Sequence, residues 1–511
     1  MRVANFFDRN LAAVAEILRG IDPTALQARL SKLAVAVAFD HTAATTSEGV
    51  TTLELAVDLL ARFYSGLSIR PLDACAETSS LAARLGKAAS AIHPGIDLRV
   101  KPSKVALCLV VGSLAPSTNT PTIFLGSCGW TALLDSAEPV GSLNSGNPFG
   151  AAAAACLGVA NTFRMIFSDE FANAPPDGRV ELDVLHHRLA RCPTVAELPP
   201  IDLESTHLVG LGAIGRATAW TLSRAENLSG ELNGVDHETI ERTNLQRYVG
   251  TTQADQANAR LKTRSVKKMF ESTKVAFVEH SSTWGQYLAG RGDFRLRRVA
   301  VALDTAEGRI AVQASLPYRL LNAWTQPGDL GVSRHTFTSG PCLACLYLPD
   351  GKVRNFSENV ADALRLPEME IREKLHVGFR VDRAFLERVS EATGVSIDIL
   401  RKFEHEPLST FYSKAVCGTA HFNTSRGSDL GALAVPMAFQ SAFAGILLAV
   451  EILADSAALR SLPMQSVTKI NLLKPLGSYL MEPSAKHRSR RCLCQDEAYI
   501  AAYHLKYADS F

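Results

Sequence analysis

The chain has 511 residues, of which 47% are hydrophobic and 20% charged, and its formal net charge is +2 at pH 7. This length predicts two to four domains with large hydrophobic cores, and the nearly balanced charge gives no indication of nucleic acid binding. Residues 1–5 lack the apolar core of a signal peptide, and no apolar run has the length of a membrane span, so we expect a cytoplasmic protein that binds no membrane.

The first 200 residues alternate strand-like and helical runs but contain no glycine fingerprint. The apolar runs Leu30–Ala38 and Lys104–Gly112 are typical of strands, and the run of small residues Phe149–Met165 predicts a helix. Pro199 and Pro200 indicate a linker after this region.

A glycine-rich turn comes next, after the apolar run that ends at Val209. Its glycines have the GxGxxG spacing, in which the first permits a tight turn, the second lets the backbone approach a phosphate, and the third lets helix and strand pack closely. The helix expected from Ala213 to about Arg224 would direct its first N–H groups at that phosphate. The candidate nucleotide-binding residues of the turn are Gly210, Gly212, Ala213, Ile214 and Gly215. The alternative is a strand-to-helix turn without a ligand.

Asp236 lies 21 residues past Gly215, where a carboxylate at the end of the second strand can accept hydrogen bonds from ribose hydroxyls. A dinucleotide is the default ligand of such a pattern. Asn244 and Arg247, however, follow at eight and eleven residues, where a dehydrogenase needs no polar pair. A planar guanidinium matches a phosphate bidentately, and an amide adds an uncharged donor, so the pair favours a triphosphate. Without this context, Asn244 would be a turn cap and Arg247 a solvated side chain.

Two further charged positions fit the same interpretation. Lys262 opens an amphipathic stretch, with Arg260 as the alternative for the same place. The apolar run Val299–Leu303 predicts a strand that ends in Asp304, at the edge of a parallel sheet where ligands gather. A helix cap is the alternative for Asp304.

Ten cysteines without a secretory signal indicate reduced thiols rather than a disulfide scaffold. They include a CxxC pair and a CxC pair, and two such pairs suit a tetrahedral zinc site that would join distant segments. These candidate zinc ligands are Cys342, Cys345, Cys492 and Cys494. The alternative is ordinary buried cysteines.

Short amphipathic helices are expected between the first pair and a further cysteine, Cys417. They are predicted at Glu358–Leu366, Glu368–His376, Asp382–Ala392 and Ile397–Phe403. After Cys417, Pro436 precedes an apolar helix over Met437–Leu453.

The glycine turn, the Asp-Asn-Arg spacing, the strand before Asp304 and the paired cysteines together resemble the ubiquitin-activating (ThiF/MoeB-like adenylation) enzyme family. The resemblance is specific over residues 205–345 and 412–495 and looser over 1–195. Tyr248 stands where the family has Gln, and Thr305 where it has Asn. The chain looks like the activating component of bacterial ubiquitin-like conjugation operons, the type associated with antiphage defence.

This resemblance implies roles for single residues. Asp236 would hold the ribose, Asn244 and Arg247 would contact the ATP phosphates with Lys262, and Asp304 would coordinate magnesium. Cys417 would be the nucleophile that takes the acyl group from the adenylate as a thioester, and we interpret the neighbouring His421 as a loop residue.

The expected fold class is α/β, with two Rossmann-like adenylation-type domains. Residues 1–195 would be a degenerate, inactive copy, 196–349 the nucleotide-binding half of the active domain, 350–412 a helical insertion, and 413–511 the part with the Cys417 loop, helix and zinc pair. For residues 1–195, the alternative is a fused conjugating domain with Cys108 or Cys128 as nucleophile.

The sequence therefore predicts an enzyme that uses ATP, Mg²⁺ and Zn²⁺ to adenylate a ubiquitin-like protein, form a thioester on Cys417 and pass the acyl group to a conjugating enzyme. A sulfur-carrier adenylyltransferase, an NAD-dependent oxidoreductase and a scaffold with a relic site are the competing hypotheses. A homodimer is left open.

Overall fold

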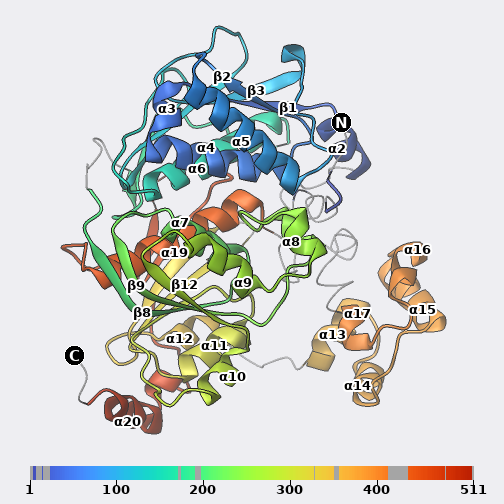
Figure 1. Ribbon diagram of the computed structural model, residues 1–511. Helices are drawn as coiled ribbons and strands as arrows, with labels where there is room; N and C mark the ends of the chain where they lie inside the picture. Colours follow the sequence, from blue (N-terminus) through green and yellow to red (C-terminus); the bar gives the residue numbers. More distant parts are fainter. Residues whose placement is uncertain are drawn as a thin grey trace. The chain divides into compact units, whose positions relative to one another are not determined.

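A computed structural model describes residues 4–6, 14, 23–170, 174–189, 197–326, 329–349, 356–412, 436–477 and 479–508. The chain divides into two compact units. The first comprises Met1–Phe7, Pro23–Leu348 and Pro436–Phe511, and the second Asp8–Asp22 and Pro349–Val435. The first unit contains two mixed sheets with helices, so the α/β class is confirmed (Figure 1).

The N-terminal sheet has the strand order β2-β1-β3-β4-β5-β6-β7. Its strands are β1 (Ala34–Phe39), β2 (Leu67–Pro71), β3 (Val105–Val111), β4 (Thr122–Cys128), β5 (Thr131–Asp135), β6 (Val180–Asp183) and β7 (Arg188–Leu189). β1 to β4 pair in parallel and the remaining pairs are antiparallel. Its helices are α2 (Pro23–Leu30), α3 (His41–Thr45), α4 (Ser47–Ala61), α5 (Ala76–Ile92) and α6 (Phe149–Ile166). The strand predicted over Leu30–Ala38 was wrong at its start, because Leu30 is the buried last residue of α2.

The C-terminal sheet has the order β10-β9-β8-β11-β12-β13-β14-β15. Its strands are β8 (Ile201–Val209), β9 (Leu228–Val235), β10 (Val275–His280), β11 (Arg298–Val301), β12 (Arg319–Thr325), β13 (Leu330–His335), β14 (Val467–Ile470) and β15 (Leu480–Glu482). The accompanying helices are α7 (Ala213–Leu222), α8 (Gln253–Ala257), α9 (Lys262–Lys267), α10 (Trp284–Ala289), α11 (Ala306–Ala314), α12 (Leu343–Tyr347), α19 (Ala438–Ser456) and α20 (Glu497–Lys506). The predicted helices after the glycine turn and after Pro436 are confirmed as α7 and α19.

The two sheets follow one pairing scheme. In each, the first strand of the half (β1 or β8) pairs in parallel with the second (β2 or β9) and with a later one (β3 or β11), and the next strand continues the parallel run. Three antiparallel pairings then complete each sheet, and β10 is an additional edge strand beside β9. In both halves, a long apolar helix lies in the sequence between the third-last and second-last strands of the sheet: α6 between β5 and β6, and α19 between β13 and β14.

These two apolar helices are almost entirely buried in the first unit. In its own half, α6 packs on α4 and α19 packs on α7, and the two long helices also pack against each other, where Phe163 and Phe439 have ring centroids 6.0 Å apart. Both are long and apolar enough to cross a membrane, by length and composition alone, but 89% of the apolar stretch of α6 and 94% of that of α19 are buried inside the protein. We therefore interpret them as core helices, which lie against the sheets and against each other.

The second unit is helical. It contains α13 (Phe356–Leu364), α14 (Glu368–His376), α15 (Arg383–Thr393), α16 (Ile397–Leu400) and α17 (Leu408–Phe411). Their apolar faces form a core that includes Val360, Ile371, Phe385, Val389 and Phe411. The four short helices predicted from amphipathic spacing are confirmed.

Candidate functional site

Three neighbouring parallel strands of the C-terminal sheet end at one edge. β8 lies between β9 and β11, so the residues that follow these strands meet at the same sheet edge, where ligands of open α/β sheets bind. The glycine turn follows β8, Asp236 follows β9 directly, and Asp304 comes three residues after β11.

The glycine turn has the close backbone packing that its spacing predicts. Gly210 has φ of +88°, a conformation that favours glycine. A Cβ atom on Gly215 would lie 1.9 Å from the carbonyl oxygen of Gly210, so no side chain fits there. Gly212 is the N-cap of α7, whose first turn therefore presents backbone N–H groups at the sheet edge.

Asp236 and Lys262 meet beside this turn. The carboxylate of Asp236 accepts the N–H of Leu211 at 2.7 Å and the N–H of Glu238 at 2.9 Å, so it is tied to the turn itself. Lys262 begins α9, is only 4% exposed, and places Nζ 3.8 Å from Oδ2 of Asp236 while it pairs with Glu238. Burial acts to lower the pKa of Lys262, but Tyr248, Asp236 and Glu238 outweigh burial, so the pKa is raised and the ammonium keeps its charge.

Tyr248 joins these groups to the glycine turn. Nζ of Lys262 lies 5.5 Å from the centroid of the Tyr248 ring, and a Cβ on Gly212 would lie 3.4 Å from the Tyr248 hydroxyl. From the sequence alone, Tyr248 was noted only as a departure from the Gln that the resembled family has at this position. No sequence signal marked it as a part of the site, because its role depends on the contact with Lys262, 14 residues later.

The structure separates the two alternatives for the basic residue on this side. Arg260 pairs with Asp255, whereas Lys262 lies beside Asp236. Only Lys262 of the two therefore lies next to the residue proposed to hold the ribose.

Asn244 and Arg247 lie in and after a short 3-10 turn, Arg242–Gln246. Oδ1 of Asn244 accepts the backbone N–H of Glu241 at 2.8 Å, so this side chain does cap its turn. Arg247 is half-buried, donates to Oε1 of Gln246 at 3.4 Å and lies 5.9 Å from the Tyr248 ring centroid. Tyr248 therefore lies near both Arg247 of this turn and Gly212 of the glycine turn.

Two buried arginines hold the loop that follows Asn244. Arg62 of α4 donates to the carbonyl oxygen of Leu245 at 2.6 Å and to that of Thr251 at 3.2 Å. Arg216 of α7 donates to the carbonyl oxygens of Val249 at 2.6 Å and Gly250 at 3.3 Å.

The partner of Arg62 contacts the same loop. Asp58 pairs with Arg62 at 2.8 Å, and its Oδ2 accepts the N–H of Gly250 at 2.8 Å. The N-terminal half thus fixes the backbone around Arg247 and Tyr248. Nothing in the local sequence marks Asp58 or Arg62 as part of the site, because the contact joins positions 183 residues apart.

Asp304 is exposed at the same sheet edge. It is not a helix cap, since Thr305 is the N-cap of α11 and accepts the N–H of Gly308 at 3.1 Å. The strand ends earlier than predicted, at Val301. Buried Arg309 fixes the segment before Asp304 through a hydrogen bond to the carbonyl oxygen of Leu303.

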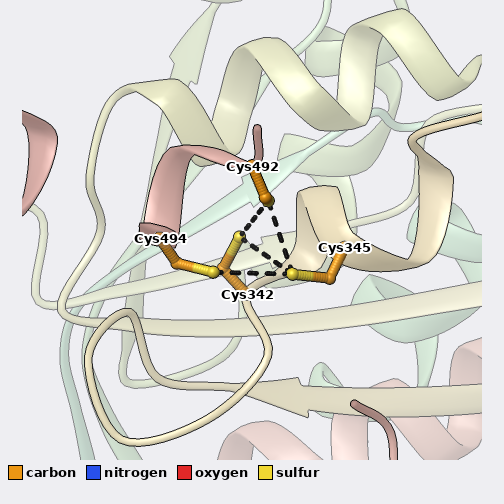
Figure 2. A group of neighbouring side chains, drawn as sticks. All are labelled: Cys342, Cys345, Cys492 and Cys494. Carbon is orange, nitrogen blue, oxygen red and sulfur yellow. Dashed lines mark hydrogen bonds between the residues drawn. The ribbon is translucent and has the colours of Figure 1, made fainter. Parts of the chain in front are cut away.

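The two cysteine pairs meet in one buried cluster, as the sequence predicted (Figure 2). Sγ of Cys492 lies 3.4 Å from the sulfurs of both Cys342 and Cys345, Cys345 lies 3.5 Å from Cys494, and Cys342 lies 4.0 Å from Cys345. Four sulfurs bound tetrahedrally to zinc at about 2.3 Å would lie about 3.8 Å apart, so the cluster has the size of a zinc site. These separations are far longer than a disulfide bond.

The remaining candidates in the C-terminal half lie outside the described residues. Cys417 and His421 fall in the segment 413–435, and their predicted roles stay predictions.

The equivalent edge of the N-terminal sheet is built differently. Asp40 follows β1, and its carboxylate accepts the N–H groups of Ala43, Ser113 and Leu114 at 3.0, 2.6 and 2.9 Å. Gly112 has φ of +125°, and a Cβ there would lie 2.2 Å from Asp40 Oδ1. A carboxylate of the chain itself therefore occupies the backbone N–H groups at this edge.

The two cysteines considered as nucleophiles in the N-terminal half are buried. Burial raises the pKa of Cys108 to about 11, and burial followed by the charge of Glu48 raises the pKa of Cys128. Both thiols are therefore protonated near neutral pH, which argues against a nucleophilic role.

Comparison with known proteins gives one full-length relative and one partial family match. The chain is 44% identical over 516 residues to the uncharacterized protein y4jF of Sinorhizobium fredii, covering 100% of this chain and 98% of the relative. Residues 38–168 match the family model described as Prokaryotic E2 family C.

Solved structures of MccB resemble part of the chain. Escherichia coli MccB, solved with AMPCPP and MccA, is 13% identical, with a TM-score of 0.33 over 56% of this chain and 65% of that chain. The Microcin C7 biosynthetic enzyme MccB, in complex with N-formylated MccA, is 13% identical, with a TM-score of 0.34 over 57% and 67%. Likeness at these scores assigns neither activity nor substrate.

Proposed function

The chain belongs to the same family as the y4jF protein of Sinorhizobium fredii, and we propose that it uses ATP to adenylate a carboxylate. The observation that carries this proposal is the meeting of Asp236 and Lys262 beside the Gly210–Gly215 turn, at the edge where β8, β9 and β11 end. This edge offers backbone donors for phosphate, a carboxylate for ribose and a buried cation for the charge of a triphosphate.

The proposed roles follow from the positions of the side chains. Lys262 and Arg247 would stabilise negative charge on the phosphates while the substrate carboxylate attacks the α-phosphate. Since adenylation involves charge movement more than covalent chemistry by the protein, positioning and electrostatics would provide most of the rate enhancement. Asn244, which caps its turn through Oδ1, would use its amide N–H toward the same phosphates.

Two metals fit the residues present. Asp304 is an exposed carboxylate at the same edge, and it would hold a magnesium ion, whose ligands are typically few carboxylates plus phosphate oxygens. When bound, magnesium would neutralise phosphate charge. The buried cluster of four cysteines would hold a zinc ion with a structural role, because all four ligand positions come from the protein.

For the substrate, we propose the carboxyl terminus of a ubiquitin-like protein, with a thioester on Cys417 as the second step and a conjugating enzyme as the next acceptor. The match of residues 38–168 to a Prokaryotic E2 family supports a place in a conjugation pathway. A sulfur-carrier adenylyltransferase would share the first step and lack the thioester.

The first test is nucleotide binding by calorimetry, with MgATP, NAD and NADH compared on the same protein. We expect MgATP to bind and the dinucleotides not to bind. Lys262→Ala should weaken MgATP binding by about 30- to 150-fold, since hydrogen bonds and ion pairs to charged groups are worth about 2–3 kcal/mol.

Arg260→Ala is the matched control, because it removes a neighbouring cation that pairs with Asp255 instead. It should leave binding within about threefold of the wild type. Tight NADH binding that survives Lys262→Ala would refute adenylation in favour of an oxidoreductase. With a candidate carrier protein present, ATP–pyrophosphate exchange with a thiol-sensitive adduct lost in Cys417→Ala would support the second step. Exchange without an adduct would favour sulfur-carrier chemistry.

A further inference from the structure

Tyr248 is a buried tyrosine whose hydroxyl points at the glycine turn. The residue is only 4% exposed. Its hydroxyl oxygen lies 3.4 Å, and its ring carbon Cζ 4.0 Å, from the position that a Cβ atom on Gly212 would take. Gly212 is the glycine of the turn whose missing side chain lets the backbone approach a phosphate. A phosphate that lies against Gly212 therefore lies beside the Tyr248 hydroxyl.

This hydroxyl has no partner within the described part of the chain. No hydrogen bond joins its oxygen to those residues, and the oxygen is not enclosed, in contrast to the partnerless hydroxyl oxygens of Tyr64 and Tyr479. The hydroxyl of a buried tyrosine usually finds a hydrogen-bond partner. Packing thus accounts for the aromatic ring, which a phenylalanine would provide as well, but it does not account for the hydroxyl.

Two cations flank the aromatic ring. Nζ of Lys262 lies 5.5 Å and Cζ of Arg247 lies 5.9 Å from the ring centroid, within the range at which a cation is attracted to an aromatic face. Both cations are proposed to bind the phosphates of ATP. The Tyr248 hydroxyl would add an uncharged donor to these two positive charges.

Backbone hydrogen bonds hold Tyr248 in this place. Its N–H donates to the carbonyl oxygen of Asn244 at 3.0 Å, and its carbonyl oxygen accepts the N–H of Thr251 at 3.1 Å. The next residue is held as well, since buried Arg216 donates to the carbonyl oxygen of Val249 at 2.6 Å. The side chain therefore needs little ordering when a ligand binds, which lowers the entropic cost of binding.

We infer that the Tyr248 hydroxyl donates a hydrogen bond to a phosphate oxygen of the nucleotide, where the phosphate lies against Gly212. The inference rests on the proposed function for the identity of the nucleotide as ATP. Because the acceptor is an anionic oxygen, this hydrogen bond is stronger than one between two neutral groups. Adenosine has no phosphate and would not make it.

The experiment compares two ligands of the full-length protein, MgATP and adenosine, through their displacement of the fluorescent ATP analogue mant-ATP. Tyr248→Phe removes the hydroxyl and keeps the ring between the two cations. We expect it to bind MgATP about 10- to 30-fold more weakly, because a hydrogen bond to a charged group is lost, and adenosine within about twofold of the wild type. The unfolding temperature should stay the same, since the hydroxyl has no partner within the described part of the chain.

A second pair of variants tests the donor without the ring. Tyr248→Gln and Tyr248→Leu introduce side chains of similar size, of which only glutamine carries an N–H donor. Tyr248→Gln should therefore bind MgATP about three- to tenfold more tightly than Tyr248→Leu. Tyr499→Phe removes an exposed hydroxyl on α20, and as the matched control it should leave MgATP binding unchanged.

Equal MgATP affinity of the wild type and Tyr248→Phe would overturn the inference and leave the adenylation proposal in place. Tighter MgATP binding by Tyr248→Leu than by the wild type would also overturn it, because the tyrosine would then occupy the place of the phosphate. If the wild type binds no MgATP at all, the proposed function is refuted together with this inference.

Discussion

The two sheets of the first unit share one strand-pairing scheme but differ in what fills the edge where their parallel strands end. In the C-terminal half, glycines leave the backbone N–H groups at the start of α7 facing the edge, with Asp236 and Lys262 beside them. In the N-terminal half, the carboxylate of Asp40 accepts hydrogen bonds from three backbone N–H groups around the ends of β1 and β3. The two halves therefore share a topology without sharing a phosphate-binding site. In the N-terminal half, the carboxylate of Asp40 already binds backbone N–H donors of the kind that a bound phosphate would use.

The shared strand-pairing scheme fits the prediction that residues 1–195 are an inactive copy of the fold, whereas the match of residues 38–168 to Prokaryotic E2 family C fits the alternative, a fused conjugating domain. In both cases the N-terminal half also contacts the other half, since α4 holds the loop next to Arg247 through Asp58 and Arg62. The N-terminal half would then contribute to the nucleotide site by fixing its backbone.

The largest effect is expected at the cysteine cluster, a feature that the described part of the N-terminal half lacks. Cys492→Ala should lower the zinc content from about one ion per chain and reduce stability by several kcal/mol, because binding energy of a structural zinc is folding energy. Metal analysis and thermal unfolding measure both.

Cys108→Ala is the control for losing a buried thiol outside the cluster, and it should cost about 1 kcal/mol or less without changing the metal content. Unchanged metal content and unfolding temperature in Cys492→Ala would contradict a structural zinc site.

The next largest effect is expected at the contact between the N-terminal half and the loop that follows Asn244. Arg62→Met should destabilise the first unit by about 3–5 kcal/mol, because it leaves Asp58 as a buried charge without its partner. We also expect weaker MgATP binding, since the carbonyl groups of Leu245 and Thr251 lose their donor. Urea unfolding and calorimetry measure the two effects.

The double variant Asp58→Leu/Arg62→Met separates these causes. Removing both charges should restore much of the stability but not nucleotide binding, because the loop still lacks its hydrogen bonds. Arg84→Ala, which breaks the exposed pair with Glu54, should change stability by less than about 1 kcal/mol. Full nucleotide binding in the double variant would contradict a role of the N-terminal half in fixing the loop.

Local patterns predicted those parts of the molecule that depend on neighbours in sequence. The glycine spacing gave the turn and the start of α7, amphipathic periodicity gave the helices of the second unit, and paired cysteines gave the cluster. An apolar run alone does not distinguish a strand from a buried helix end, so Leu30 was assigned to the wrong element.

Long-range contacts explain what sequence reasoning missed. Arg62 looks like any helix arginine until the fold places it on the loop 183 residues away, and Tyr248 gains its place through Lys262. Asp40 was not singled out at all, because nothing in its own segment shows that Ser113 and Leu114 will direct their N–H groups at it.

The smallest expected effect tests this last point, the internal anion of the N-terminal half. Burial alone would raise the pKa of Asp40, but donors from Thr42, Ala43, Ser113 and Leu114 outweigh it and lower the pKa below the ordinary value of 3.8. Asp40→Asn should therefore cost about 2–3 kcal/mol at pH 7, since hydrogen bonds to a charged group are lost and an amide must face N–H donors.

The pH dependence has a defined sign. Because the folded pKa is the lower one, the carboxylate stabilises the fold fully above the unfolded pKa, and this contribution is lost as the pH falls through the folded pKa. The stability difference between wild type and Asp40→Asn should thus be constant from pH 5 to 7 and shrink below pH 4, as measured by urea unfolding. A difference that grows on acidification would mean that Asp40 is protonated in the folded chain. The N-terminal edge would then hold no anion, and the contrast between the two halves would need another cause.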